Sequence, residues 1–326
     1  MKPAFSVIFL TTLIGAGQGL FLALFTAESY AAFDLLPKQP DYFYAIGSAI
    51  ALTFLAGGLI ASFFHLGRPE RAWRAATQWR TSWLAREVIV LPVFMGTVFL
   101  YGMAHWLGVN PELAALPSGA PVNVTAVLGT AGTVLAFALF VCTGMVYACL
   151  RFLREWHTPL TVVNYILLGG ASGFVFAALF SAWVLPELTR FFAGWALVIT
   201  FIAMLSRVAS LVRNVRLKPK STLQSALGIK HPRIAQKTQG AMGGSFNTRE
   251  FFHGRPDSVL GVVKWTFLAL AFVVPMTTLG AAMIAEVPAP HLIAAFIAQF
   301  PGLLAERWFF FAQASHPQNL YYQSAA

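Results

Sequence analysis

Eight long apolar runs constrain the fold of this 326-residue chain more than any other feature. About 20 apolar residues in a helix span the roughly 30 Å of hydrocarbon in a bilayer. The runs are unbroken and lack the period-two alternation of barrel strands, so they favour helices. We therefore predict an all-α polytopic membrane protein, a bundle of eight transmembrane helices with approximate limits 4–26, 43–65, 84–106, 123–150, 160–184, 189–212, 259–284 and 290–311.

The composition supports a membrane protein with one domain. Charged residues make up 10% of the chain, whereas they make up about 25% of an average soluble domain. The first apolar run lacks a small-residue cleavage site, so we interpret it as a retained span rather than a signal peptide. No soluble domain or internal repeat is evident, and we expect residues 1–326 to form a single membrane-anchor domain.

The basic residues are distributed very unequally between the two sides of the predicted bundle. Of the 22 Lys and Arg residues, 20 fall on the side of the termini, and only Lys38 and Arg190 fall on the other. The positive-inside rule then places both termini in the cytoplasm, together with the loops 63–87, 151–159 and 213–258. The basic loop 213–258 is the longest of these. Because topology explains the net charge of +10, we do not expect a nucleic-acid partner.

The sequence contains few residues that could bind a metal ion or a haem. Cys142 and Cys149 lie in one apolar run, and two cysteines cannot hold an iron–sulfur cluster or a four-ligand zinc ion. No histidine lies in the middle of a span, although a haem between His65 and His157 is conceivable. We expect no haem or metal in this chain. A solute transporter is disfavoured because such proteins place polar groups at mid-depth.

The segment 63–87 joins the second and third spans and carries the most unusual chemistry. His65 ends one span and Glu87 begins the next, so both should lie at the same depth. Ionisable groups in membranes are costly and are candidates for function. An imidazole titrates near neutral pH, and a neighbouring carboxylate could take a second proton. We predict that His65 and Glu87 bind the head group of a quinone and exchange protons with it.

The same segment also has interpretations that involve no bound ligand. His65 could be a snorkelling interfacial residue, and Glu87 an acid favoured by the N-terminus of its helix. The arginines and tryptophans between them could be interfacial anchors, with a short amphipathic helix beginning at Pro69. The alternative is that they line the quinone site or bind an acidic partner.

Two groups of residues follow from this interpretation. The candidates for quinone binding are His65, Arg68, Arg71, Trp79, Arg80, Ser82, Trp83 and Glu87, with His65 and Glu87 in the catalytic role. The candidates for partner docking are Arg74, Arg86, Arg151, Arg154, Arg249 and His316.

Three motifs carry a family resemblance. "HLGRPERAWRA" (65–75), "RTSWLARE" (80–87) and "ERWFFFAQASHPQNLYY" (306–322) resemble the membrane-anchor subunits of dimethyl-sulfoxide reductase, the DmsC-like family. These anchors are similar to the wider polysulfide-reductase class of eight-helix, haem-free, quinone-reactive subunits. The resemblance implies two partners, a molybdenum subunit with molybdopterin guanine dinucleotide and a four-cluster iron–sulfur subunit. The quinol-site residues of the family carry over to His65 and Glu87.

The basic loop 213–258 indicates which anchors within this family the chain resembles more. Its stretches "LKPKSTLQSALGIKHP" (217–232) and "AMGGSFNTREFFHG" (241–254) are more similar to anchors of cytoplasmic sulfite-oxidising complexes. This implies electron flow from sulfite to ubiquinone or menaquinone at the bacterial inner membrane. The alternatives are the anchor of a dimethyl-sulfoxide or N-oxide reductase that oxidises menaquinol, and a passive anchor without a quinone site. In each case this chain does not act on the substrate of the molybdenum subunit.

Overall fold

The computed structural model describes residues 4–115, 121–218, 221–235, 257–285 and 288–315. Within them, eight helical segments are long and apolar enough to cross a membrane, which confirms the prediction of an all-helical, eight-span fold. They are α1 (Phe5–Ala32), α2 (Asp41–Phe63), α3 (Trp83–Leu107), α4 (Val124–Ala148), α5 (Pro159–Val184), α6 (Thr189–Val215), a seventh built from α9 (Asp257–Leu268), η3 (Ala269–Val273) and α10 (Val274–Ile284), and α11 (Ala289–Ala312).

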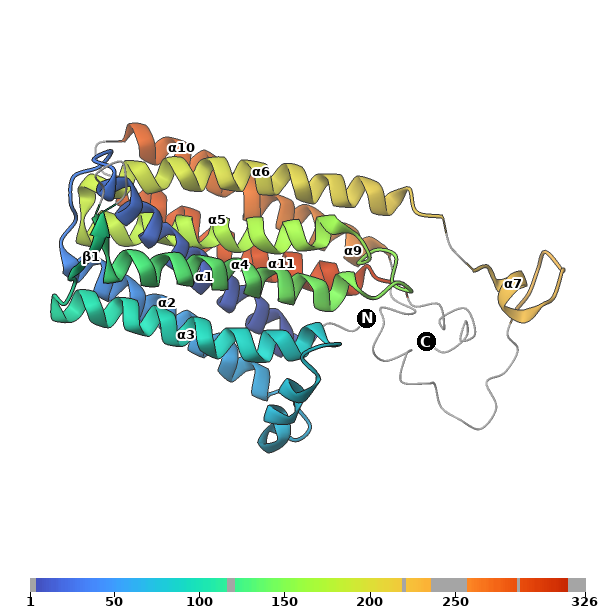
Figure 1. Cartoon of the computed structure of the whole chain (residues 1–326). Coiled ribbons are helices and arrows are strands. Elements are labelled where there is room, and N and C mark those ends of the chain that lie inside the picture. Colours follow the sequence, from blue (N-terminus) through green and yellow to red (C-terminus); the bar gives the residue numbers. More distant parts are fainter. Residues whose placement is uncertain (1–3, 116–120, 219–220, 236–256, 286–287, 316–326) are drawn as a thin grey trace.

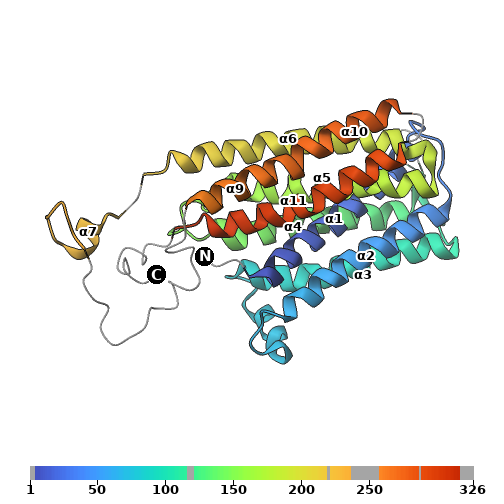
Figure 2. The same cartoon turned by 180° about the vertical axis from the view of Figure 1, so that it is seen from behind.

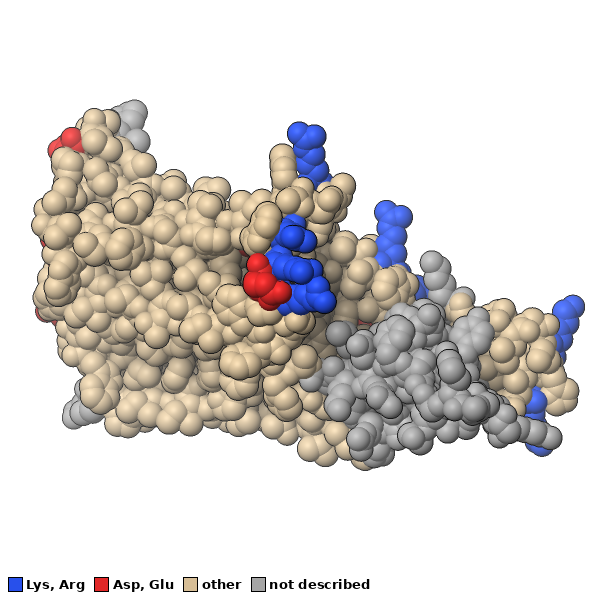
Figure 3. All heavy atoms as spheres, turned by 90° about the horizontal axis from the view of Figure 1, so that it is seen from below, with Lys and Arg blue, Asp and Glu red and all other residues tan. Residues whose placement is uncertain are grey.

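The eight segments run alternately up and down in one elongated bundle (Figures 1 and 2). α1 begins and α11 ends at the same end of the bundle, which also holds the end of α2 and the start of α3. We call this the basic end and the other the acidic end. Figure 3 shows Lys and Arg near the basic end and an uncharged belt between them and the acidic end. Such a belt is what the hydrocarbon of a bilayer requires.

The centre of the bundle is formed by α1 and α5. In these helices 72% and 67% of the most apolar window is buried, whereas the other six have 28–44% buried. Apolar side chains alone do not bring helices together in lipid, so close contact depends on small residues. "GAGQG" in α1 and "GGASG" in α5 each place two glycines four residues apart.

The α1–α5 contact leaves no room for side chains at these glycines. A Cβ atom on Gly19 would lie 2.2 Å from the carbonyl oxygen of Gly169, and one on Gly173 would lie 2.0 Å from the carbonyl carbon of Gly19. The two backbones therefore touch. This contact explains why α1 and α5, far apart in the sequence, form the core.

The seventh span departs from a regular α-helix. η3 is a π-helical turn that precedes Pro275, whose missing N–H interrupts the α-helical hydrogen bonds. Gly302 of α11 packs against this turn, since a Cβ there would lie 2.4 Å from the backbone nitrogen of Ala271.

The connections contain short elements. The helix expected at Pro69 is present as η1 (Pro69–Gln78), a 3₁₀ helix that extends beside the bundle at its basic end (Figure 1). α7 (Leu223–Leu227) lies in the loop after α6, and η2 (Pro186–Leu188) links α5 to α6. A small antiparallel sheet, β1 (Glu112–Ala115) with β2 (Pro121–Asn123), joins α3 to α4 at the acidic end and was not predicted.

Candidate functional site

Glu87 lies in the first turns of α3, where its carboxylate is directed into the bundle. Ser82 caps this helix, because its hydroxyl accepts a hydrogen bond from the backbone nitrogen of Ala85 at 3.3 Å. The hydroxyl of Thr143 on α4 donates to Oε1 of Glu87 at 2.6 Å. A carboxylate of one span is thus held against the next span, close to the basic end.

Glu87 opens onto a small polar cavity with a volume of about 20 Å³. A cavity of this size has room for about one water molecule. Polar side chains from five helices line it: Thr11, Thr12 and Gln18 of α1, Glu87 of α3, Thr143 of α4, Tyr165 and Ser172 of α5, and Arg307 of α11. The carboxylate therefore faces groups that can bind water or relay a proton.

His65 lies in the exposed turn that follows α2. Partial burial of its ring lowers the pKa of the imidazole and so favours the neutral form. It is not among the residues that line the cavity beside Glu87. The structure places both predicted catalytic residues at the basic end, but in different surroundings.

An apolar groove reaches Phe64, the residue before His65. It has a volume of about 400 Å³ and is lined by α1 and α2, through Ser6, Phe9, Leu13, Gly57, Ile60, Ala61 and Phe64. It lies on the face of α1 opposite Thr11, because positions 6, 9 and 13 share a helix face, and Thr12 lies between this face and Thr11. A groove of this kind suits a hydrocarbon chain.

A buried cluster of charges lies between α6 and α11. Nε of Arg207 lies 2.6 Å from Oε1 of Glu306, and Nε of Arg307 lies 3.0 Å from Oε2 of the same carboxylate. The three residues are 1–4% exposed. The guanidinium carbon of Arg307 also lies 4.0 Å from the ring centroid of Tyr165, so this arginine connects the charge cluster to the cavity beside Glu87.

The buried cluster was not predicted, because its charged residues were counted only as part of the cytoplasmic excess. A usable signal was present, since Arg207 is an isolated cation within an apolar run and Glu306 and Arg307 precede an aromatic run. All three lie about two turns from a helix end, where a charge is still costly. Only the packing of α6 on α11 shows that they pair with one another.

Comparison with known proteins identifies the family. The profile of the DMSO reductase anchor subunit (DmsC) family matches residues 1–312. The chain belongs to this family. It is also 57% identical to a sulfite dehydrogenase subunit of Allochromatium vinosum, over 327 residues that cover 100% of both chains. It is thus a polytopic membrane anchor, as its motifs and its eight spans indicate.

In this anchor protein, part of the arginine–tryptophan segment has a local structural role. The guanidinium of Arg86 donates to the carbonyl oxygens of Trp79 and Arg80 at 2.9 Å each and lies 4.2 Å from the ring centroid of Trp83. These contacts join the end of η1 to α3. These contacts and the helix cap formed by Ser82 give Arg86 and Ser82 structural roles that need neither a bound ligand nor a partner.

The other predicted residues of the segment remain accessible. Arg68, Trp79 and Arg80 are exposed, and Arg71 forms a loose surface pair with Glu70 at 3.8 Å. Their exposure at the basic end leaves them free for a partner or a head group.

The predicted docking residues lie on the basic end where the structure describes them. Arg74 and Arg151 are exposed, and Arg154 donates to the carbonyl oxygen of Lys218 at 2.5 Å. Arg249 and His316 lie outside the described residues.

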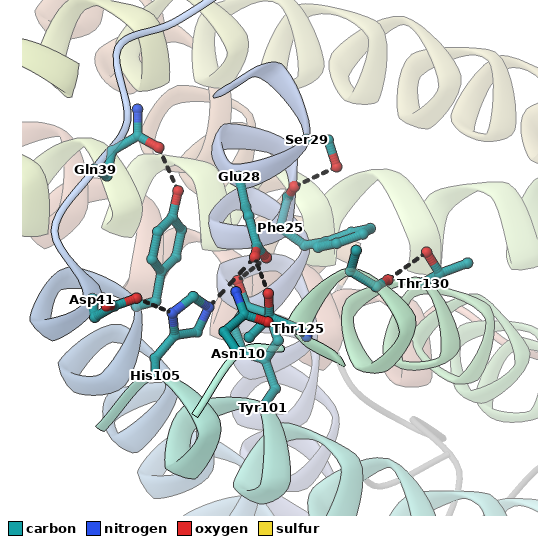
Figure 4. A network of polar contacts seen from close by, with 12 residues as sticks. Phe25, Glu28, Ser29, Gln39, Asp41, Tyr101, His105, Asn110, Thr125 and Thr130 are labelled. Atoms are coloured by element: carbon teal, nitrogen blue, oxygen red, sulfur yellow. Dashed lines mark hydrogen bonds and ion pairs between the residues drawn. The ribbon is translucent and has the colours of Figure 1, made fainter. Parts of the chain in front are cut away.

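A second polar cluster lies at the acidic end (Figure 4) and was also missed. Glu28 accepts hydrogen bonds from Tyr101 at 2.7 Å and Thr125 at 2.5 Å, and Nδ1 of His105 lies 2.8 Å from Asp41. The cluster borders a cavity of about 900 Å³. Because its members come from α1, α2, α3 and α4 and pair with one another, it joins these four helices.

Among the described residues, no group of three or more His, Cys, Asp or Glu side chains is arranged to hold a metal ion. Nδ1 of His157 lies 2.6 Å from the carbonyl oxygen of Ala148, so this nitrogen is engaged with the backbone.

Proposed function

We propose that this chain is the quinone-reactive membrane anchor of a sulfite-oxidising molybdenum complex. The proposal is supported by the full-length similarity to a protein named as a subunit of sulfite dehydrogenase. An iron–sulfur subunit with four clusters would bind the anchor, and a molybdenum subunit with molybdopterin guanine dinucleotide would oxidise sulfite. The anchor would pass the electrons to ubiquinone or menaquinone.

The charge distribution supports an orientation in the inner membrane. The positive-inside rule favours the basic end in the cytoplasm, with both termini and the partner-facing loops. An exposed arginine surface on η1 and the loop after α4 would attract an acidic iron–sulfur partner over about 8 Å at physiological salt. The partner's nearest cluster would then lie beside the end of the bundle that holds Glu87.

The proposed reduction of quinone to quinol balances in electrons and protons. The quinone gains two electrons from the partner and two protons from the cytoplasm to become quinol, while the partner's clusters are reoxidised. We place the isoprenoid tail in the apolar groove between α1 and α2 and the head group beside His65, which follows Phe64 of that groove. The cavity beside Glu87 is too small for a quinone ring, so its role would be the passage of protons.

The single observation that carries the proposal is the position of Glu87. Its carboxylate lies within a membrane span, receives a hydrogen bond from Thr143 and faces a polar cavity. Buried ionisable groups in membranes are rarely retained without function. A bare structural anchor needs no carboxylate there.

Substitutions at the two predicted catalytic residues test the proposal. We expect Glu87→Gln to lower quinone-linked turnover by about 100-fold or more, the usual contribution of a general acid or base. His65→Ala should lower it as well, although less, because His65 is exposed and water can replace it. Dye-linked sulfite oxidation should stay at the wild-type rate, because dyes accept electrons before the quinone site.

Four outcomes would contradict parts of the proposal. Unchanged quinone kinetics in both variants would indicate a passive anchor. Recovery of the chain without molybdenum and iron–sulfur subunits under mild detergent would favour a different class of membrane protein. Co-purification with a protein that reduces S-oxides or N-oxides with quinol electrons would reverse the direction of flow. A Soret band in the spectrum of the isolated chain would show that it binds haem.

A further inference from the structure

We propose that two water-sized cavities, joined at Tyr165 and Arg307, form a proton path from the basic end to Glu87. The inference rests on the proposed quinone chemistry and adds the route by which its protons arrive. The residues that line the two cavities come from α1, α3, α4, α5, α6 and α11 and from the turn between α4 and α5.

The first cavity is the one beside Glu87. Among its lining residues, Thr12 has a buried hydroxyl with no hydrogen-bond partner within the described part of the chain, and the buried hydroxyl of Tyr165 interacts with the side chains of Arg307 and Tyr147. Buried hydroxyls are nearly always hydrogen-bonded to protein or to ordered water. With a volume of about 20 Å³, the cavity has room for the water that would satisfy the Thr12 hydroxyl.

The second cavity lies further toward the basic end and has a volume of about 10 Å³. Asn164 and Arg207 line it, and Oδ1 of Asn164 and Nη2 of Arg207 have no hydrogen-bond partner in the described residues. Two unsatisfied polar atoms around one small space are an environment in which buried water binds. Ser210, whose hydroxyl accepts from Asn164 at 2.8 Å, lies on the same wall.

Tyr165 and Arg307 line both cavities. A tyrosine hydroxyl can donate and accept at once, so it can pass a proton between a water on either side. Arg307 cannot release its proton and instead holds a fixed positive charge over the Tyr165 ring. The hydroxyl of Tyr165 is therefore the connecting group of the path.

The outer end of the path is Glu155. It lies in the turn between α4 and α5, lines the second cavity, and is only partly buried. Its Oε1 accepts a hydrogen bond from the backbone nitrogen of Ser315 at 3.3 Å, which leaves the other oxygen for water. A partly exposed carboxylate at this position can collect protons from the aqueous phase.

The buried charges beside the path have an excess of one positive charge. Arg207 and Arg307 share one carboxylate, Glu306, so this cluster alone has a net charge of +1. Glu87 and Arg307 line the same first cavity, and the Glu87 carboxylate accepts the hydrogen bond of Thr143. The other titratable or charged groups that interact with Glu87 are Tyr147, Tyr165 and Cys142, with Arg86 beside it in the sequence.

The test is Tyr165→Phe in the assembled complex, with sulfite as electron donor and a soluble quinone analogue as acceptor. This change removes the hydroxyl and keeps the ring that Arg307 covers. We expect quinone-linked turnover to fall by about tenfold, less than on loss of Glu87 itself. The loss should grow as the pH rises, because fewer protons enter, and the solvent deuterium isotope effect should increase. Sulfite oxidation with a dye as acceptor should not change.

A second variant and a matched control isolate the path. Asn164→Leu fills the second cavity with hydrocarbon and should produce the same changes in pH profile and isotope effect. Tyr101→Phe removes an equally buried hydroxyl at the acidic end, and its quinone kinetics should match the wild type. If Tyr165→Phe does not assemble, Asn164→Leu decides by the same criteria.

The outcomes separate the two proposals. Wild-type pH profiles and isotope effects in Tyr165→Phe and Asn164→Leu, with turnover abolished in Glu87→Gln, would overturn the path and leave the quinone site intact. Wild-type kinetics in both Glu87→Gln and His65→Ala would overturn the quinone proposal itself. Equal losses in Tyr101→Phe would show that any buried tyrosine is required for folding, which would also overturn the path.

Discussion

Glu306→Gln should destabilise the bundle by about 3–5 kcal/mol, the usual effect of breaking a buried ion pair from one side. The carboxylate of Glu306 is 1% exposed and contacts both Arg207 and Arg307 through nitrogen–oxygen distances of 2.6 and 3.0 Å. Its neutralisation leaves two guanidinium groups in a low-dielectric interior without a counter-charge. The measurement is the free energy of unfolding of the purified protein in mixed micelles.

Glu70→Gln is the matched control for this prediction. Glu70 also pairs with an arginine, but the side chains of Arg71 and Glu70 are 51% and 66% exposed and the pair distance is 3.8 Å. Water screens such pairs, so the change should alter the free energy of unfolding by about 0.5 kcal/mol or less. Equal effects of the two substitutions would show that the buried cluster does not stabilise the fold.

Gly173→Ala is expected to cost about 3 kcal/mol or more, at the upper end of overpacking penalties. The new Cβ atom would lie 2.0 Å from the carbonyl carbon of Gly19, which belongs to the backbone and cannot rotate away. α1 and α5 would have to separate, and they form the core of the bundle. Lower accumulation in membranes and a lower free energy of unfolding should both be observed.

Gly280→Ala provides the comparison, because nothing lies within 4 Å of a Cβ atom at this position in α10. Alanine is the better helix former by up to about 1 kcal/mol, so this change should be neutral or slightly stabilising. A Gly173→Ala protein as stable as Gly280→Ala would mean that α1 and α5 are not in backbone contact.

The spans could be predicted from sequence because the bilayer imposes a minimum length and a low charge on each. The predicted limits fall within a few residues of most helices. The first span differs most, since it was predicted to end at 26 but extends to Ala32. Glu28 lies between the two limits, and a charged residue usually marks the edge of a span. In the structure Glu28 accepts hydrogen bonds from Tyr101 and Thr125, which stabilise its carboxylate, so the helix continues past it.

The candidate site could be predicted only in part. The position of Glu87 in a span followed from its place at the head of an apolar run, but its hydrogen bond with Thr143 on the next span did not. The surroundings of His65 did not follow, because sequence spacing sets depth but not the direction of a side chain. Ser82 and Arg86 were assigned to ligand or partner, whereas hydrogen bonds within the chain use both.

The sequence by itself determined that this chain crosses a membrane eight times, which family it resembles, and which side carries the positive charge. These properties depend on composition along the chain, and the cost of charge in hydrocarbon makes composition decisive. Only the tertiary structure decided which helices touch and which charges pair. Those outcomes depend on backbone contact between glycines of α1 and α5, distant in the sequence, and on a single carboxylate, Glu306, meeting arginines from two helices. Contacts of this kind join residues that are far apart in the sequence, so no local sequence pattern predicts them. The same packing brings Tyr165 and Arg307 to the same cavity as Glu87.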